Sequence, residues 1–280
     1  MALCARTECR RWRPTWYARV ARAGLRLDDA WYCSSACLEL AARRHLREAR
    51  RVPTGRVAAI PPPRMGGLLI HQGVITRDVL QRGLAQQERT GHRLGDELQR
   101  LGVVQSVDVL RALAAQENVP YLTALDVNKV RQGPGPLSRD AVRALQLVPF
   151  DANEETRTLK VVCVAPVPRL SLSALRELTG WSAEAYLVSD ALWPALLEAY
   201  GTGREDAATL RETATVHDLT GAARRVARLA KDDGGVRLTQ ARCDPYLWVR
   251  LEGAQRAEDL WLSVDQDIEE QTCQTVPSLR

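Results

Sequence analysis

The stretch RMGGLLIHQGVITRDVLQRGLAQQERTGHRLGDELQRLGVVQSVDVLRALAAQ, residues 64–116, contains one pattern twice. Residues 64–87 align without gaps with residues 93–116, and nine of the 24 aligned positions are identical. Each copy begins with an arginine, has a glycine two residues later and ends on a glutamine. Because self-similarity at a fixed period marks repeated supersecondary units, the sequence predicts two copies of one structural unit.

Each copy has the pattern of a short helix, a turn and a longer helix. Gly73 and Gly102 are placed to end the short helices, and Thr76 and Ser106 offer hydroxyl groups as N-caps of the longer ones. Two apolar residues and the glutamine follow at positions i, i+4 and i+7, so they share one helix face. These are Leu80, Leu84 and Gln87 in the first copy and Val109, Leu113 and Gln116 in the second. The sequence therefore predicts a pseudo-twofold surface.

Such a surface suits a symmetric ligand that carries bases and phosphates. The arginine fork matches a guanine edge or a phosphate, leucines can cover a base or ribose face, and a glutamine both donates and accepts. A glycine near the arginine allows backbone N–H groups to approach a ligand closely. The alternative is that the leucine stripes only pack the two helical hairpins together and that the glycines only end helices.

The repeated pattern R-L-G-x-x-L-x-x-x-G-x-L-x-x-x-x-L-x-x-A-L-x-x-Q resembles the tandem motif of the MshEN domain. This is the N-terminal domain of type II secretion and type IV pilus assembly ATPases, and it binds cyclic di-GMP. The resemblance implies ligand-binding residues at the matching positions. They are Arg64, Met65, Gly66, Leu69, Leu80, Leu84 and Gln87, and Arg93, Leu94, Gly95, Leu98, Val109, Leu113 and Gln116. Three departures from the motif, Met65, Gly83 and Val109, remove no polar group.

Residues 120–200 change to a pattern of strands and helices. Strands are expected at 145–153, 158–167 and 182–189, and helices at 170–180 and 190–201. This order is similar to the α+β second half of the same domain, so the resemblance covers residues 64–200. Cys163, in mid-strand with no histidine beside it in sequence, is expected in the core.

The C-terminal part predicts a small separate unit. A polar linker is expected at 201–215, and residues 216–264 predict one amphipathic helix and strands in an α-β-β unit. This unit is similar to the small segment that follows the MshEN domain in those ATPases. The polar residues 265–280 predict a disordered tail.

The N-terminal segment contains two close pairs of cysteines, Cys4 with Cys9 and Cys33 with Cys37. Two such pairs separated by a loop are typical of a tetrahedral zinc site, and so small a module needs a metal to fold. The run WYCSSACL, followed by a helix, resembles the end of a treble-clef-like zinc ribbon. We therefore expect a structural zinc module at 1–50 and a proline-rich linker at 51–63; the alternative is four reduced cysteines that bind no metal.

Positive charge is concentrated in the same segment. Residues 1–51 contain 12 arginines and five acidic residues, a net of +7. Trp12, Trp16 and Trp31 lie among these arginines and suit either stacking on nucleic acid or the mini-core of the zinc module. Nucleic acid therefore stays a possible partner.

The sequence contains none of the enzyme motifs that we sought. No G-x-x-x-x-G-K-[ST] phosphate loop, H-E-x-x-H or G-x-S-x-G occurs, so the resemblance comes without an ATPase core and predicts no enzyme. No run of about 18 apolar residues and no secretory signal occurs, which favours a cytoplasmic chain without membrane insertion.

Three functions fit these observations. The first is a non-enzymatic cyclic di-GMP receptor that relays the signal to a protein partner in a motility, secretion or regulatory complex. The second is an adaptor of pilus or secretion machinery that binds no nucleotide, and the third is a regulator whose zinc ribbon binds nucleic acid. In each case the expected fold is α+β and multidomain, with a zinc ribbon, tandem helical hairpins, an α/β sandwich and a C-terminal α-β-β unit.

Overall fold

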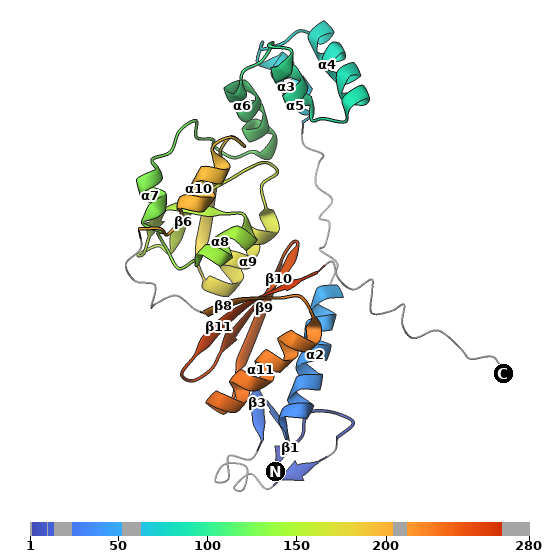
Figure 1. Ribbon diagram of the computed structural model, residues 1–280, viewed down its shortest axis with the longest axis vertical. Helices are drawn as coiled ribbons and strands as arrows, with labels where there is room; N and C mark the ends of the chain where they lie inside the picture. Colours follow the sequence, from blue (N-terminus) through green and yellow to red (C-terminus); the bar gives the residue numbers. More distant parts are fainter. Residues whose placement is uncertain (1, 10, 14–23, 52–62, 204–211, 265–280) are drawn as a thin grey trace, which may run out of the picture. The chain divides into compact units, whose positions relative to one another are not determined.

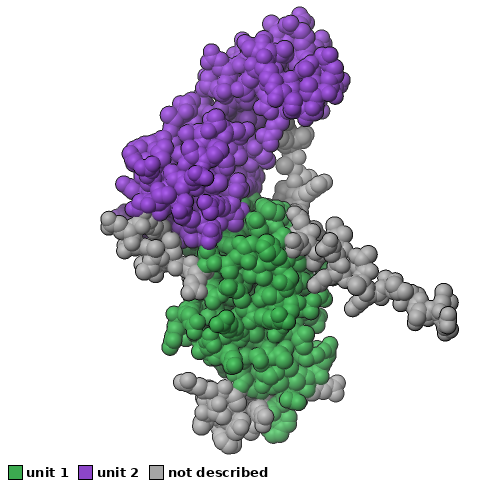
Figure 2. Space-filling model, in the orientation of Figure 1, with its two compact units in different colours: residues 1–54, 170–180, 208–280 green, residues 55–169, 181–207 purple. Residues whose placement is uncertain are grey.

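The chain folds into two compact units that each combine helices with sheets, as expected for an α+β protein (Figure 2). Unit 1 contains residues 1–54, 170–180 and 208–280, and unit 2 contains residues 55–169 and 181–207. This computed structural model describes residues 2–9, 11–13, 24–51, 63–203 and 212–264. The expected tail 265–280 and most of the linkers expected at 51–63 and 201–215 lie outside the described residues.

The repeat in unit 2 forms a short and a long helix in each copy (Figure 1). The helices are α3 (Met65–His71), α4 (Arg77–Thr90), α5 (Leu94–Arg100) and α6 (Ser106–Glu117). The short helix of each copy packs on the long helix of the other copy, since α3 packs on α6 and α5 packs on α4. Equivalent residues of the two copies, Leu69 with Leu98 and Ile75 with Val104, share one hydrophobic cluster. The repeat therefore stabilises itself by mutual packing.

Local chemistry ends the short helices where the sequence predicted. Gly73 and Gly102 have φ values of 72° and 68°, the left-handed conformation that glycine adopts without strain. Thr76 caps α4, because its side chain accepts a hydrogen bond from the Val79 amide at 3.4 Å. The first copy therefore follows the expected turn chemistry.

The N-cap predicted at Ser106 is wrong, since the cap of α6 is Gln105. The Gln105 side chain accepts from the amide of Asp108, and the Asp108 carboxylate accepts from the Gln105 amide at 3.0 Å. Gln105 is the position equivalent to Thr76, so both copies keep the same register with different capping groups.

The rest of unit 2 is a three-stranded sheet with helices. Strand β6 (Thr158–Cys163) lies between β5 (Val148–Asn153), to which it is antiparallel, and β7 (Ser182–Leu187), to which it is parallel. These strands lie within the ranges expected from sequence. The helices of this part are α7 (Val127–Arg131), α8 (Arg139–Leu145) and α10 (Trp193–Ala199). The sequence did not predict α7 and α8, which are too short to show an apolar period.

Unit 1 is built on a four-stranded sheet in the order β8-β11-β10-β9. The strands are β8 (Glu212–Val216), β9 (Arg237–Cys243), β10 (Tyr246–Glu252) and β11 (Ala257–Ser263), and α11 (Leu219–Asp233) connects the first two. Strand β8 pairs in parallel with β11, and the other pairs are antiparallel. The linker expected to extend to residue 215 is therefore wrong at its end, because residues 212–215 belong to an edge strand.

The N-terminal segment belongs to the same unit as this sheet. It contains β1 (Ala2–Leu3), β2 (Trp12–Arg13), β3 (Leu25–Leu27), β4 (Ala30–Tyr32) and α2 (Ser35–Arg51). Helix α2 packs beside α11, and Leu38 and Leu46 share one cluster with Val226, Val249 and Leu260 (Figure 1). The division of the chain into a 1–50 module and a 216–264 unit therefore does not describe the folded protein. The small ribbons are too short to cover the apolar face of α2, and the C-terminal helix and sheet cover it instead.

The opposite face of the sheet contains a buried ion pair between neighbouring strands. The Arg250 Nε and Nη2 atoms lie 2.9 and 3.0 Å from the two carboxylate oxygens of Asp259. The guanidinium lies 5.1 Å from the ring centroid of Trp248, which stacks on Trp261 at 4.8 Å. Its Nη1 atom donates to the carbonyl of Leu178, in the last turn of α9 (Arg169–Thr179). Arg250 therefore joins β10, β11 and the end of α9.

Candidate functional site

A cavity of about 500 Å³ lies in unit 2, and the second copy of the repeat supplies one wall of it. We call it the α5–α6 cavity. Its volume falls in the range of ~300–1,000 Å³ that is usual for small-molecule sites. The predicted ligand residues that line it are Met65, Arg93, Gly95, Val109, Leu113 and Gln116. The structure therefore brings together one cation, one amide and an apolar surface from the residues that the motif indicated.

The glycines of the motif allow close packing of helices. A Cβ atom on Gly95 would lie 3.0 Å from Val109 Cγ1 and 3.5 Å from Met65 Cε. In the first copy, a Cβ atom on Gly66 would lie 2.6 Å from Leu80 Cδ1. The equivalent glycines thus let the short helix of each copy approach its long helix, so their role in the structure is the packing of the wall.

Several other predicted residues hold this wall in place. Leu69 and Leu98 are fully buried in the cluster between the two copies. Leu80 and Leu94 are half-buried and pack against the same cluster. These residues position the helices and do not line the α5–α6 cavity.

Three predicted ligand residues of the first copy lie outside the α5–α6 cavity. Arg64 and Leu84 are exposed and Gln87 is half-buried, and none of the three lines the α5–α6 cavity. Leu84 is 42% exposed, which is unusual for a leucine on the face that the motif marks. The first copy therefore presents the same residue types on an open surface.

The opposite wall of the cavity comes from residues that sequence reasoning missed. They are Ala165 and Pro166, after β6, Leu187, the last residue of β7, and residues 188–191, after β7. Among them, Asp190 has its Oδ2 atom 3.7 Å from Arg93 Nη1. The signal that the sequence offers for them is their position at or just beyond the ends of the strands predicted at 158–167 and 182–189.

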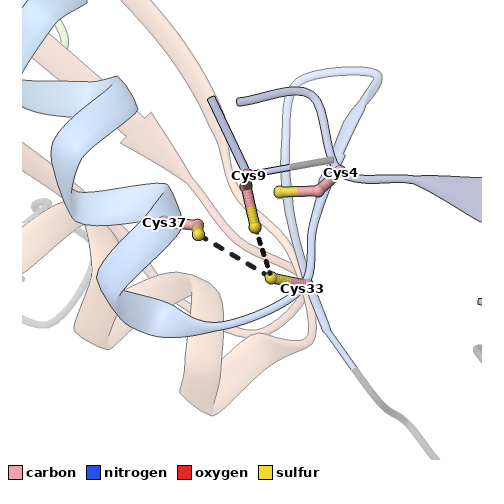
Figure 3. Close-up of side chains that lie close together, drawn as sticks. All are labelled: Cys4, Cys9, Cys33 and Cys37. Atoms are coloured by element: carbon pink, nitrogen blue, oxygen red, sulfur yellow. Dashed lines mark hydrogen bonds between the residues drawn. The ribbon is translucent and has the colours of Figure 1, made fainter. Parts of the chain in front are cut away.

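Four cysteine side chains converge at a second place, in unit 1 (Figure 3). We call Cys4, Cys9, Cys33 and Cys37 the cysteine cluster, and all four sulfur atoms lie within 4.8 Å of one another. The Sγ atom of Cys33 is 3.5 Å from that of Cys9 and 3.7 Å from that of Cys37. Ligands at the usual Zn–S distance in a tetrahedral site would lie roughly 3.8 Å apart. The cluster could therefore hold a metal ion.

The two cysteines that follow β4 differ in acidity. Burial and hydrogen bonds with the neighbouring thiols raise the pKa of Cys33 to about 12. Burial also acts to raise the pKa of Cys37, but hydrogen bonds, first from the Ser34 hydroxyl, lower it to about 7. Cys37 is therefore the more readily ionised of the two near neutral pH.

Cys163 is a buried core residue, as expected, and its reactivity gives a simple test. Burial raises the pKa of its thiol to about 12, so the neutral thiol persists throughout the physiological range. We expect iodoacetamide at pH 8 to leave Cys163 unmodified in the native chain and to alkylate it in denaturant, as read by peptide mass spectrometry. Alkylation of native Cys163 at the rate of an exposed thiol would contradict this burial.

The tryptophans near the cysteine cluster have different surroundings. Trp31 is half-buried and packs against the core of unit 1, as the mini-core interpretation requires. Trp12 is 58% exposed, and its partner across the β1–β2 pair, Leu3, is 62% exposed. Trp16 lies outside the described residues. The mini-core interpretation therefore applies to Trp31 and not to Trp12.

Part of the chain is similar to known proteins. Among the helices of the described residues, none is both long and apolar enough to cross a membrane. No protein-family model matches the chain. Solved structures similar to it include MshE with cdg, at 24% identity over 49% of this chain and 99% of that chain, with a TM-score of 0.39. The N-terminal domain of XpsE matches at 20% identity over 49% of this chain and 93% of that chain, with a TM-score of 0.34.

A curated protein also matches by sequence. The type IV pilus assembly ATPase PilB of Thermus thermophilus is 25% identical over 130 residues, which cover 46% of this chain. The matching segment spans only 15% of the length of that ATPase. Nearly half of this chain is therefore similar to a small part of a type IV pilus assembly ATPase.

Proposed function

We propose that unit 2 is a non-enzymatic receptor domain for cyclic di-GMP. The observation that carries this proposal is the convergence of predicted ligand residues of the second copy on the α5–α6 cavity. Arg93 supplies a planar cation, Leu113 an apolar surface and Gln116 a group that donates and accepts, as a guanine nucleotide requires. The resemblance of the tandem motif to the MshEN domain supports the same ligand.

The first copy would bind the other half of the ligand. Arg64, Leu84 and Gln87 repeat the residue types of the cavity wall, and the exchange of helix partners relates the two copies. Cyclic di-GMP has two equivalent halves, so a pseudo-symmetric pair of sites suits it. Binding would cover Leu84, which is otherwise exposed.

The interactions available from these residues are of the size that a micromolar ligand requires. A micromolar ligand needs about 8 kcal/mol. Hydrogen bonds to charged groups contribute ~1.5–3 kcal/mol each, and complete burial of a leucine contributes about 1.5–3 kcal/mol. Two arginines with Leu84 and Leu113 thus offer gross contributions of this order, from which the cost of association is subtracted.

Substitution of Arg93 tests the site directly. We expect Arg93→Ala to weaken cyclic di-GMP binding at least about tenfold in calorimetric titration of the full chain, since one hydrogen-bonded cation is lost. Arg82→Ala is the matched control, because Arg82 is exposed on α4 and lies outside the face that the motif marks. GTP and cyclic AMP serve as control ligands.

The same titration decides between the receptor and the nucleotide-free adaptor. If Arg93→Ala and Arg82→Ala bind as tightly as the unchanged chain, the cavity is not the site. If the unchanged chain does not bind at all, the adaptor function remains.

The sequence similarity to PilB supports a protein partner in a pilus or secretion machine. We propose that the bound state of unit 2 is relayed to such a partner. Co-purification of the chain with and without cyclic di-GMP, followed by mass spectrometry, would identify a partner whose recovery depends on the ligand. Equal recovery of every partner in both samples would contradict the relay.

We also propose that the cysteine cluster binds a structural zinc ion. The sulfur positions support this, because thiolates are strong zinc ligands and the four sulfurs are close enough for one tetrahedral ion. Elemental analysis of the purified chain is expected to find one zinc per chain. A Cys37→Ser chain is expected to lose most of it, whereas Cys163→Ser, outside the cluster, keeps it. Zinc-free protein that is fully folded would overturn this assignment.

A further inference from the structure

The α5–α6 cavity contains more negative than positive side chains. Arg93 is the one cation among its lining residues, and three carboxylates accompany it, from Asp96, Glu117 and Asp190. The Glu117 carboxylate lies 3.4 Å from Arg169 Nη2, so that charge is compensated. Of the other two carboxylates, that of Asp190 lies beside Arg93, the cation expected to contact the ligand.

Asp190 is the carboxylate that faces the arginine. Its Oδ2 atom lies 3.7 Å from Arg93 Nη1, and both side chains are about three-quarters exposed, at 73% and 74%. An ion pair this open contributes little to stability, typically ~0–1 kcal/mol. The pair therefore contributes little to folding, and both side chains are accessible to a ligand.

The backbone around Asp190 is held firmly. The Val188 amide donates to the Cys163 carbonyl at 3.0 Å, which continues the pairing of β7 with β6. The amides of Leu192 and Trp193 donate to the Ser189 carbonyl at 3.1 and 3.2 Å, at the start of α10. Asp190 thus lies between a strand end and a helix start, and its carboxylate is presented to the cavity from a fixed backbone.

We propose that Asp190 makes the cavity specific for guanine, an inference that rests on the proposed function. A guanine base presents two acceptors, O6 and N7, on one edge, and two donors, N1–H and the N2 amino group, on another. Arginine matches the acceptors in a bidentate manner, and a carboxylate matches the donors. Adenine lacks the N2 amino group and has an acceptor at N1, so the same carboxylate disfavours it. Arg93 and Asp190 together therefore select guanine.

Competition between two cyclic dinucleotides tests this role. We expect the unchanged chain to bind cyclic di-GMP at least about 100-fold more tightly than cyclic di-AMP, as read by calorimetric titration. Asp190→Asn should weaken the binding of cyclic di-GMP at least about tenfold, since an amide offers one acceptor and no charge. It should also reduce the ratio between the affinities for cyclic di-GMP and cyclic di-AMP. Glu184→Gln is the control, because Glu184 is exposed on β7 and does not line the α5–α6 cavity, and it should keep both affinities.

The outcomes separate this inference from the proposed function. If Asp190→Asn binds cyclic di-GMP as tightly as the unchanged chain, or more tightly, Asp190 does not read the base, although the receptor function stands. If the unchanged chain binds neither dinucleotide, both the receptor function and the role of Asp190 fail. Circular dichroism of each variant would show that the fold is retained.

Discussion

Removing the zinc ion proposed for the cysteine cluster is expected to unfold unit 1, including the sheet of β8 to β11. The hairpin β3–β4 that precedes Cys33 is hydrogen-bonded to the start of that sheet, because the Asp28 amide donates to the Val236 carbonyl at 2.8 Å. The Val236 amide donates in return to the Arg26 carbonyl at 2.9 Å. Structural zinc contributes ~10–16 kcal/mol in zinc-finger peptides, against a total of about 5–15 kcal/mol for a domain. A zinc ion bound as proposed would therefore decide whether this unit is folded.

Hydrogen exchange of the full chain measures this effect. After chelation, or in Cys37→Ser, the amides of β10 and β11 should lose at least about 100-fold of their protection, which corresponds to ~2.7 kcal/mol. Cys163→Ser is the control, since this residue lies outside the cluster and in unit 2. Unchanged protection of β10 and β11 in metal-free protein would contradict the inference that the N-terminal segment and the C-terminal sheet fold around one shared core.

Replacing Asp259 with alanine is expected to lower the free energy of unfolding of unit 1 by about 3–5 kcal/mol. The Asp259 carboxylate accepts two hydrogen bonds from Arg250, and both side chains are less than one-tenth exposed. Without the carboxylate, the Arg250 guanidinium stays buried against Trp248 and keeps its hydrogen bond to the Leu178 carbonyl. An uncompensated buried cation is strongly destabilising, and chemical denaturation followed by tryptophan fluorescence measures the loss.

An exposed ion pair in the same unit is the control. Arg44 and Glu48 form an i,i+4 pair on α2 with both side chains well exposed, so Glu48→Ala should change stability by less than about 1 kcal/mol. Replacing Arg250 with methionine and Asp259 with leucine together should recover much of the loss, because neither charge then remains buried. If Asp259→Ala lowers the free energy of unfolding by less than about 1 kcal/mol, the buried ion pair does not stabilise unit 1.

Local features of the fold could be predicted from the sequence. The repeat, the helix ends at Gly73 and Gly102 and the cap at Thr76 depend on neighbouring residues alone. The cap at Gln105 was missed because a hydroxyl stood one position later, at Ser106. The alignment of the copies already placed Gln105 opposite Thr76, so the repeat was the better guide to this cap.

Contacts between distant segments could not be predicted. The apolar stripe of α2, with Leu38, Ala42 and Leu46, shows that something covers this helix, but not that α11 does. Strand β8 was missed because a five-residue edge strand has too little apolar pattern to distinguish it from a linker. The pairing partner that stabilises it, β11, lies more than 40 residues away in sequence.

In the candidate site too, local features could be predicted from the sequence and contacts between distant segments could not. The motif marked Arg93, Val109 and Gln116, which line one wall of the cavity. It could not mark Asp190, because the loop after β7 reaches the cavity only through the packing of the sheet against the repeat. Nor could it show that Gly95 serves helix packing, since the same glycine pattern suits close approach to a ligand.

The most direct measurement is calorimetric titration of the full chain with cyclic di-GMP. We expect saturable binding of one dinucleotide per chain with a dissociation constant near the micromolar range, about 8 kcal/mol. Absence of binding at ~100 µM ligand, which corresponds to about 5.5 kcal/mol, would contradict it. In that case the repeated residues serve only to pack the helical hairpins together, and the α5–α6 cavity is not a nucleotide site.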